Sequence, residues 1–259
     1  MNEESTGDIA LVVGAGGPTG GPFIWSALEE LTARTGWDPT SASQVIGTSA
    51  GAFVAARFGE RTAVDADALA ALRQLANGHE FSSSLPTRAI RVIRTVGGRL
   101  VARLSPLSRD IAEYGVPEGP YHEGASAVTV QRSNAKRVHH RLRSVEAEAV
   151  VRASAAIPFV NKPIDVEGKL HVDGATHSAN NADLVAGTPD VVVVVSPMIP
   201  ATDGKIVSRA HRAQLRGEVQ VLLDRGAAVV LILPSAQAHA TRRDRERFAP
   251  EGAVAVRRL

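Results

Sequence analysis

Short apolar runs alternate along this chain with longer segments whose apolar positions recur at helical spacing. The short runs are Ile9 to Val13, Gln44 to Ile46, Ala127 to Val130, Lys169 to Val172, Asp190 to Ser196 and Ala227 to Leu233. Residues 191–195 are all valine, and a β-branched run without polar residues favours a strand that is buried on both faces. The pattern predicts an α/β fold, a three-layer α/β/α sandwich with a mainly parallel central sheet.

The longer segments predict helices between and after these strands. The predicted helices are Gly21 to Thr35, Ala50 to Phe58, Asp65 to Ala76, Val145 to Ala155, Ser208 to Asp224 and Thr241 to Phe248. The chain has 259 residues and no low-complexity linker, so we expect a single domain over residues 1–259, with a lid or cap insertion at about 81–121.

The composition excludes several kinds of site and compartment. The absence of cysteine rules out disulfides, thiolate zinc sites and a cysteine nucleophile. A net charge of only +2 predicts no nucleic-acid partner. The polar start lacks the features of a secretory signal, and the apolar runs are far shorter than the roughly 20 residues that span a bilayer. We therefore expect a soluble, cytoplasmic protein.

The first part of the segment at 81–121 carries positive charge only. Between Phe81 and Arg109 there is no acidic residue, and the arginines are Arg88, Arg91, Arg94, Arg99, Arg103 and Arg109. With apolar residues interleaved, this pattern favours a solvated cap helix whose apolar side is in the core. The alternative is a transient, peripheral contact with an anionic membrane surface.

The string Gly47-Thr48-Ser49-Ala50-Gly51 lies between a predicted strand and a predicted helix. In a nucleophile elbow, a serine occupies a sharp strand-to-helix turn, and the flanking glycines leave room where the chain doubles back. This context makes Ser49 a candidate nucleophile. The alternative is a glycine-rich helix cap in which Ser49 bonds only to nearby backbone.

A glycine-rich turn, Gly14 to Gly21, follows the first strand directly, and its backbone N–H groups can converge on an anion. One candidate anion is a cofactor phosphate, as in NAD(P)-binding Rossmann enzymes, and the other is the oxyanion of an acyl-transfer reaction. A third interpretation is a close-packed turn that binds no ligand. The second strand ends in the serine motif and not in a charged residue that could bind the ribose of a dinucleotide. This difference favours the oxyanion.

Asp173 follows the predicted strand Lys169 to Val172 and precedes Gly174 and Ala175. An aspartate in such a turn can accept the Ser49 hydroxyl proton during attack and return it to the leaving alcohol. Because Asp-Gly is also a common structural turn, this motif alone leaves both roles open.

In their order, these motifs resemble those of the patatin-like phospholipases, serine hydrolases that use a Ser-Asp dyad. The resemblance spans about Ile9 to Met198 and includes two supporting stretches, Ala153 to Pro158 before the aspartate and Asn180 to Leu184 after it. It implies that Ser49 is the nucleophile, that Asp173 is the base, and that no cofactor or metal is needed. It also implies an elbow formed by Gly47, Thr48, Ala50 and Gly51, and an oxyanion hole formed by Gly16, Gly17, Pro18, Thr19 and Gly20.

Four positions depart from the family pattern, and one of them, Ala175 in place of a second glycine, is a mild departure. Ala15 replaces the first of three glycines, and Thr19 replaces a basic residue before the last glycine of the loop. We expect the loss of this charge to weaken oxyanion stabilisation or the binding of an anionic substrate, although the backbone donors remain. Trp25 stands where a small residue is common, and we expect it to narrow the acyl pocket or to alter the packing of the first helix.

An α/β-hydrolase with serine, acid and histidine in that chain order is a second hydrolase interpretation. His177, His211 and His239 all follow Asp173. Such an elbow normally follows several strands, whereas Ser49 follows one or two, and no histidine lies in a distinctive motif. The spacing of the histidines also predicts no metal site.

We therefore expect a lipid acyl hydrolase of the phospholipase A type, which cleaves carboxylic esters through a Ser49 acyl-enzyme. The expected partner is a lipid or another acyl-ester substrate. Two other functions stay open: an NAD(P)-binding Rossmann oxidoreductase, and a patatin-fold protein that binds lipid without turnover.

Overall fold

The computed structural model describes residues 7–76, 115–116, 118–144, 146–199, 206–234 and 254–255. The predicted helix Thr241 to Phe248 and most of the predicted lid at 81–121 lie outside these residues. Among the described helices, none combines the length and the apolar character needed to cross a membrane.

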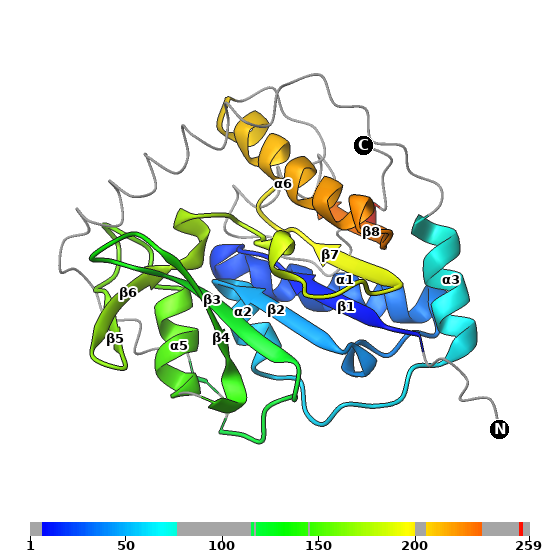
Figure 1. Cartoon of the computed structure of the whole chain (residues 1–259), viewed down its shortest axis with the longest axis horizontal. Coiled ribbons are helices and arrows are strands. Elements are labelled where there is room, and N and C mark those ends of the chain that lie inside the picture. Colours follow the sequence, from blue (N-terminus) through cyan, green and yellow to red (C-terminus); the bar gives the residue numbers. More distant parts are fainter. Residues whose placement is uncertain are drawn as a thin grey trace.

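A nine-stranded sheet forms the centre of the fold (Figure 1). Its strand order is β5-β6-β3-β2-β1-β7-β8-β9, and β4 pairs with β3 beside that path. The strands are β1 (Ile9–Val13), β2 (Gln44–Thr48), β3 (Ala125–Gln131), β4 (Arg137–Arg141), β5 (Ile164–Val166), β6 (Lys169–Asp173), β7 (Val191–Val195), β8 (Ala228–Pro234) and β9 (Val254–Ala255).

The sheet is mixed, so the prediction of a mainly parallel sheet holds only for its centre. The neighbours β3, β2, β1, β7 and β8 run parallel. The strands β4 and β6 pair with β3 in the antiparallel direction, and β5 with β6 and β9 with β8 are antiparallel as well. A hydrophobic run indicates that a segment is buried but not in which direction it runs, and this is why the pattern missed the change at the edges.

Helices cover both faces of the parallel centre, which confirms the predicted α/β/α sandwich (Figure 1). Alternate residues of β1 and β7 explain this arrangement. The helices are α1 (Gly20–Thr35), α2 (Ala50–Ala55), α3 (Ala66–Ala76), α5 (Ala147–Ser154) and α6 (Ile206–Asp224). The odd-numbered residues of the two strands, which begin with Ile9 and Val191, pack with α1, α2 and α3. The even-numbered residues Val12, Val192 and Val194 pack with α6. The run of valines is therefore buried on both faces, as its composition predicts.

Most predicted elements begin and end within two residues of their predicted bounds, but α2 is three residues shorter. The prediction extended this helix to Phe58. The N–H groups of Arg57 and Phe58 instead bond to carbonyls three residues earlier, which tightens and ends the helix.

Two parallel neighbours, β1 and β2, bring two turns together at one edge of the sheet. Val13 pairs with Gly47, so the glycine-rich turn after β1 and the serine turn after β2 both leave from the carboxyl edge. In parallel α/β sheets this edge is the usual position of a ligand site.

Candidate active site

Ser49 occupies a strained turn between β2 and α2. Its φ is 56° and its ψ is −119°, and a positive φ is uncommon for a residue other than glycine. The flanking glycines are needed for steric reasons: a Cβ at Gly51 would overlap the carbonyl of Val13, and one at Gly47 would collide with Ala52. The local geometry thus has the features expected of a nucleophile elbow.

The backbone of Ser49 is also held from α5. Its N–H donates to Ser154 Oγ at 3.0 Å, and the Ser154 hydroxyl donates to the Val128 carbonyl at 2.7 Å. Ser154 is the last residue of α5, and Val128 lies in β3. The strained turn is therefore tied to two neighbouring elements.

Asp173 ends β6, where it pairs with Thr129 of β3. Its N–H donates to the Ala156 carbonyl at 2.9 Å, and its Oδ1 accepts the N–H of Ala175 at 2.7 Å. A Cβ on Gly174 would overlap the Val128 carbonyl, so glycine is required directly after the aspartate. Backbone pairing and a capping bond thus fix both the position and the direction of the carboxyl group.

The structure brings Ser49 and Asp173 together, although 124 positions separate them in the sequence. Ser49 Oγ donates a hydrogen bond of 2.8 Å to Asp173 Oδ2, and both residues are buried, with 4% and 3% of their surface exposed. Burial raises the pKa of Asp173 to about 7, against the opposing effect of the hydrogen bonds from Ala175 and Ser49. A carboxyl group with such a pKa can accept and release a proton near neutral pH.

The predicted oxyanion loop starts as an anchored segment. The N–H of Gly14 donates to the Val195 carbonyl at 2.9 Å, and the N–H of Ala15 donates to the Ala179 carbonyl at 2.7 Å. The loop then forms a short 3-10 helix, Gly17–Thr19, and the N–H of Gly20 bonds to the Gly17 carbonyl.

This geometry narrows the list of possible oxyanion donors in the loop. The N–H of Gly20 bonds inside the loop, and Pro18 has no N–H, so the candidate backbone donors are the other residues of the loop. Gly17 begins the 3-10 helix with a φ of 59°, and no atom lies within 4 Å of the place where its Cβ would be. An N–H at a helix start has no partner inside the helix, so Gly17 stays among the candidate donors.

The histidines of the triad alternative are not placed between Ser49 and Asp173. The direct hydrogen bond leaves no position for an imidazole between the two side chains. His177 follows Asp173 in the next turn, where its carbonyl accepts from Gln214, and His211 lies on α6. His239 lies outside the described residues.

Two other histidines are buried near Asp173. His140 and His171 each hydrogen-bond to Thr129 Oγ1, at 2.9 and 2.7 Å, and burial lowers the pKa of both rings. They form a buried polar cluster with Thr129. Within the described part of the chain, no group of three or more histidine or acidic side chains could hold a metal ion.

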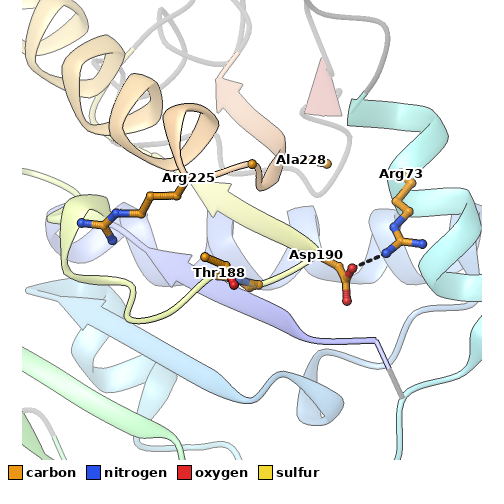
Figure 2. Close-up of a pocket in the computed structure, with 7 residues that line it drawn as sticks. Arg73, Thr188, Asp190, Arg225 and Ala228 are labelled. Atoms are coloured by element: carbon orange, nitrogen blue, oxygen red, sulfur yellow. Dashed lines mark hydrogen bonds and ion pairs between the residues drawn. The ribbon is translucent and has the colours of Figure 1, made fainter. Parts of the chain in front are cut away.

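A cavity of about 270 Å³ lies at the amino edge of the parallel strands, whereas the Ser49 turn leaves from their carboxyl edge. It is bordered by Asp190 and Ala228, at the amino ends of β7 and β8. Figure 2 shows Arg73 directed at Asp190, with which it forms an ion pair, and Arg225 directed away from it; Arg225 donates to the Val185 carbonyl. The cavity is therefore separate from the two turns that surround Ser49.

Two further residues of the site were not singled out from the sequence. Ser154 holds the Ser49 N–H, and Asn181 Nδ2 donates to Thr48 Oγ1 at 3.1 Å. Both lie in the supporting stretches of the family resemblance. For Ser154 the available signal was a polar side chain within the otherwise apolar stretch 153–158, whereas Asn181 lies among other polar residues and had no such signal.

A family profile described as patatin-like phospholipase matches residues 11–186, which is more than half of the chain. No curated protein sequence matches. Among solved structures, VipD from Legionella pneumophila matches with a TM-score of 0.40 and 10% identity over 89% of this chain, which spans 61% of that one. On the family match, the chain belongs to the patatin-like phospholipases, a family of lipid hydrolases.

Proposed function

We propose that this protein hydrolyses carboxylic esters of lipids through a covalent acyl-enzyme on Ser49. The observation that carries the proposal is the buried 2.8 Å hydrogen bond from Ser49 Oγ to Asp173 Oδ2. A serine hydroxyl is a weak nucleophile until a neighbouring base removes its proton, and Asp173 is the base in direct contact with it.

In the proposed reaction, Ser49 Oγ attacks the ester carbonyl carbon while its proton passes to Asp173. The carbonyl oxygen becomes an oxyanion, stabilised by the N–H groups of Gly17 and of Ala50, the residue that follows the nucleophile. When the tetrahedral intermediate collapses, Asp173 gives the proton to the leaving alcohol, and the acyl group stays on Ser49. Asp173 then takes a proton from the water that attacks the acyl-enzyme, and it returns this proton to Ser49 Oγ as the bond to the acyl group breaks and the fatty acid leaves.

The glycine-rich loop supports the hydrolase over the dinucleotide-binding alternative. A phosphate turn presents its first N–H groups to the ligand. Here the N–H groups of Gly14 and Ala15 bond to the carbonyls of Val195 and Ala179. A dinucleotide phosphate would have to displace both bonds.

The turn from Ile157 to Asn161 supports contact with a lipid surface. Ile157, Phe159 and Val160 are exposed by 40%, 50% and 51%, and they account for most of the large hydrophobic side chains exposed in the described residues. The N–H groups of Val160 and Asn161 both bond to the Ile157 carbonyl, and Phe159 has a φ of 70°. A turn that holds apolar side chains outward in a fixed conformation is suited to insertion between lipid chains.

This turn lies next to the proposed site. Ala156, which directly precedes Ile157, accepts the N–H of Asp173 at 2.9 Å. The exposed Lys162 follows the turn and adds a positive charge that suits anionic headgroups. We propose that the protein takes its substrate at a membrane surface with this turn facing the lipid.

Hydrolysis of p-nitrophenyl esters with short and long acyl chains tests the proposed function. The parent is compared with Ser49→Ala and Asp173→Asn, and with the exposed controls Ser133→Ala and Asp165→Asn. We expect kcat/KM to fall by at least about 10³-fold in both dyad variants and to stay unchanged in the controls, because a nucleophile and its base act as one unit. A fluorophosphonate should label the parent but not Ser49→Ala.

Two results would contradict the proposal. Unchanged rates in Ser49→Ala and Asp173→Asn would show that another group performs the chemistry. A parent without esterase activity that still binds lipid vesicles would support the lipid-binding protein without turnover.

A further inference from the structure

One turn, residues 178–183, joins the two loops that surround Ser49. The Ala179 carbonyl accepts the N–H of Ala15 at 2.7 Å, which anchors the glycine-rich loop. Asn181 Nδ2 donates to Thr48 Oγ1 at 3.1 Å, which anchors the residue directly before Ser49. Movement of this turn would therefore shift the nucleophile and the oxyanion loop together.

Hydrogen bonds within the 178–183 turn make it rigid. Ser178 Oγ accepts the N–H groups of Asn180 and Asn181, each at 3.2 Å. Asn181 Nδ2 also donates to the Ser178 carbonyl at 2.7 Å, and its backbone is in the left-handed region, with φ 57° and ψ 34°. Asparagine tolerates this conformation better than most residues.

Two charged side chains brace the turn from outside. Glu218, on α6, accepts the N–H of Ala182 at 3.0 Å. Arg137, on β4, binds both oxygens of Asp183 at 2.7 Å and donates to Asn181 Oδ1 at 3.2 Å. The turn is thus held between a helix and a strand that carry neither Ser49 nor Asp173.

Glu218 is an unusual residue to find on the apolar face of a covering helix. Only 6% of it is exposed, and its neighbours on this face of α6 are Leu215, Val219 and Leu222. Burial raises the pKa of Glu218 to about 7, and the negative charge of Asp183 acts in the same direction, against the hydrogen bonds and Arg137. Burying a carboxyl group costs stability unless hydrogen bonds compensate it, and here those bonds all go to the turn.

We propose that Glu218 is a positioning residue for the hydrolytic site, fixing the 178–183 turn and through it both Thr48 and the glycine-rich loop. It touches neither the substrate nor the reacting atoms. This inference rests on the proposed function for its kinetic consequence, while its structural consequence can be measured without turnover.

The test compares Glu218→Leu, Glu218→Gln and a control, Asp224→Ala, which removes an exposed carboxylate from the same helix. For a short p-nitrophenyl ester, we expect Glu218→Leu to lower kcat by about 10- to 100-fold with KM within about threefold, because small misplacements of reacting groups slow chemistry more than binding. Glu218→Gln keeps an acceptor for the Ala182 N–H and should recover kcat to within about threefold of the parent. Asp224→Ala should match the parent.

A double-mutant cycle connects Glu218 to the elbow. Thr48→Val removes the acceptor of the Asn181 amide, so it interrupts the same chain of contacts. The combination with Glu218→Leu should cost hardly more in kcat than the larger single effect, because residues in one network do not add. Deuterium uptake of peptides covering 9–20 and 44–51 should be faster in Glu218→Leu and unchanged in Asp224→Ala.

The outcomes separate the two proposals. If the parent hydrolyses the ester but Glu218→Leu keeps both its kcat and its deuterium uptake in these peptides, the positioning role is wrong and the hydrolase proposal stands. Additive effects in the double variant would also contradict the positioning role. If the parent is inactive, the hydrolase proposal fails, and deuterium uptake still decides whether Glu218 fixes these loops.

Discussion

Ser154 Oγ accepts the backbone N–H of Ser49 at 3.0 Å, so the end of α5 holds the strained residue in place. We expect Ser154→Ala to lose about 1–3 kcal/mol of unfolding free energy, because a buried N–H is left without a partner. It should also lower kcat, because Ser49 can relax from its positive φ. Urea unfolding measures the stability and ester hydrolysis measures kcat, with the exposed Ser133→Ala as the control. If Ser154→Ala keeps the stability and the kcat of the parent, this hydrogen bond is dispensable.

The pKa of Asp173 sets the pH dependence of the proposed reaction. Only the ionised carboxylate can accept the Ser49 proton, and burial raises its pKa to about 7. We therefore expect kcat/KM to rise with pH through about 7 and to level off above it. A profile that is flat between pH 5 and 8 would exclude Asp173 as the base.

The same pKa predicts that Asp173 lowers stability at alkaline pH. Its pKa is about 7 in the folded chain against an ordinary value of 3.8, so between these values the folded state binds the extra proton and stability falls as pH rises. The full penalty is present above pH 7. Asp173→Asn, which stays neutral, should therefore unfold at a higher temperature than the parent at pH 8 and show a smaller advantage at pH 5. A gain that does not depend on pH would contradict this assignment.

Two glycines provide a matched test of the elbow geometry. A Cβ at Gly51 would overlap the backbone of Val13, whereas a Cβ at Gly21, in the first turn of α1, would meet no atom within 4 Å. We expect Gly51→Ala to be strongly destabilising and inactive, since two backbone segments would have to separate. Gly21→Ala should be neutral or stabilising by up to about 1 kcal/mol. Thermal unfolding of both variants checks this, and equal effects would contradict the close approach.

Exposed apolar residues allow the proposed lipid contact to be tested separately from the chemistry. Phe159→Ser should reduce sedimentation with phosphatidylcholine/phosphatidylglycerol vesicles severalfold and leave the rate on a short soluble ester within about twofold. Leu223→Ser is the control, because Leu223 is 36% exposed at the end of α6. Equal losses for both variants, or no loss for Phe159→Ser, would show that the turn from Ile157 to Asn161 does not bind lipid.

The sequence predicted the sandwich, and the residues that meet at the carboxyl ends of its parallel strands, better than it predicted the outermost strands of the sheet. The valines of β7 and the glycines around Ser49 are dictated by burial and by backbone clearance, which leave clear patterns. The strand β5 was missed because it has three residues, and its turn to β6 places Glu167 at a φ of 52°, where Asn or Asp would have been the usual signal.

The network around Glu218 was out of reach of the sequence for a different reason. Its contacts join α6 to a turn 36 residues earlier, and no local pattern specifies such a pair. A single glutamate within a predicted helix is interpreted as solvent-exposed unless the element that packs against it is known.

Hydrogen-bond ladders, and not the length of the chain between them, determine the distance between Ser49 and Asp173. Ser49 follows β2, which pairs with β3, and Asp173 ends β6, which pairs with the same β3. The strand β3, which carries neither residue, is therefore the common scaffold of the dyad. A change that shifts the register of β3 against either neighbour should separate Ser49 from Asp173 and break the 2.8 Å contact.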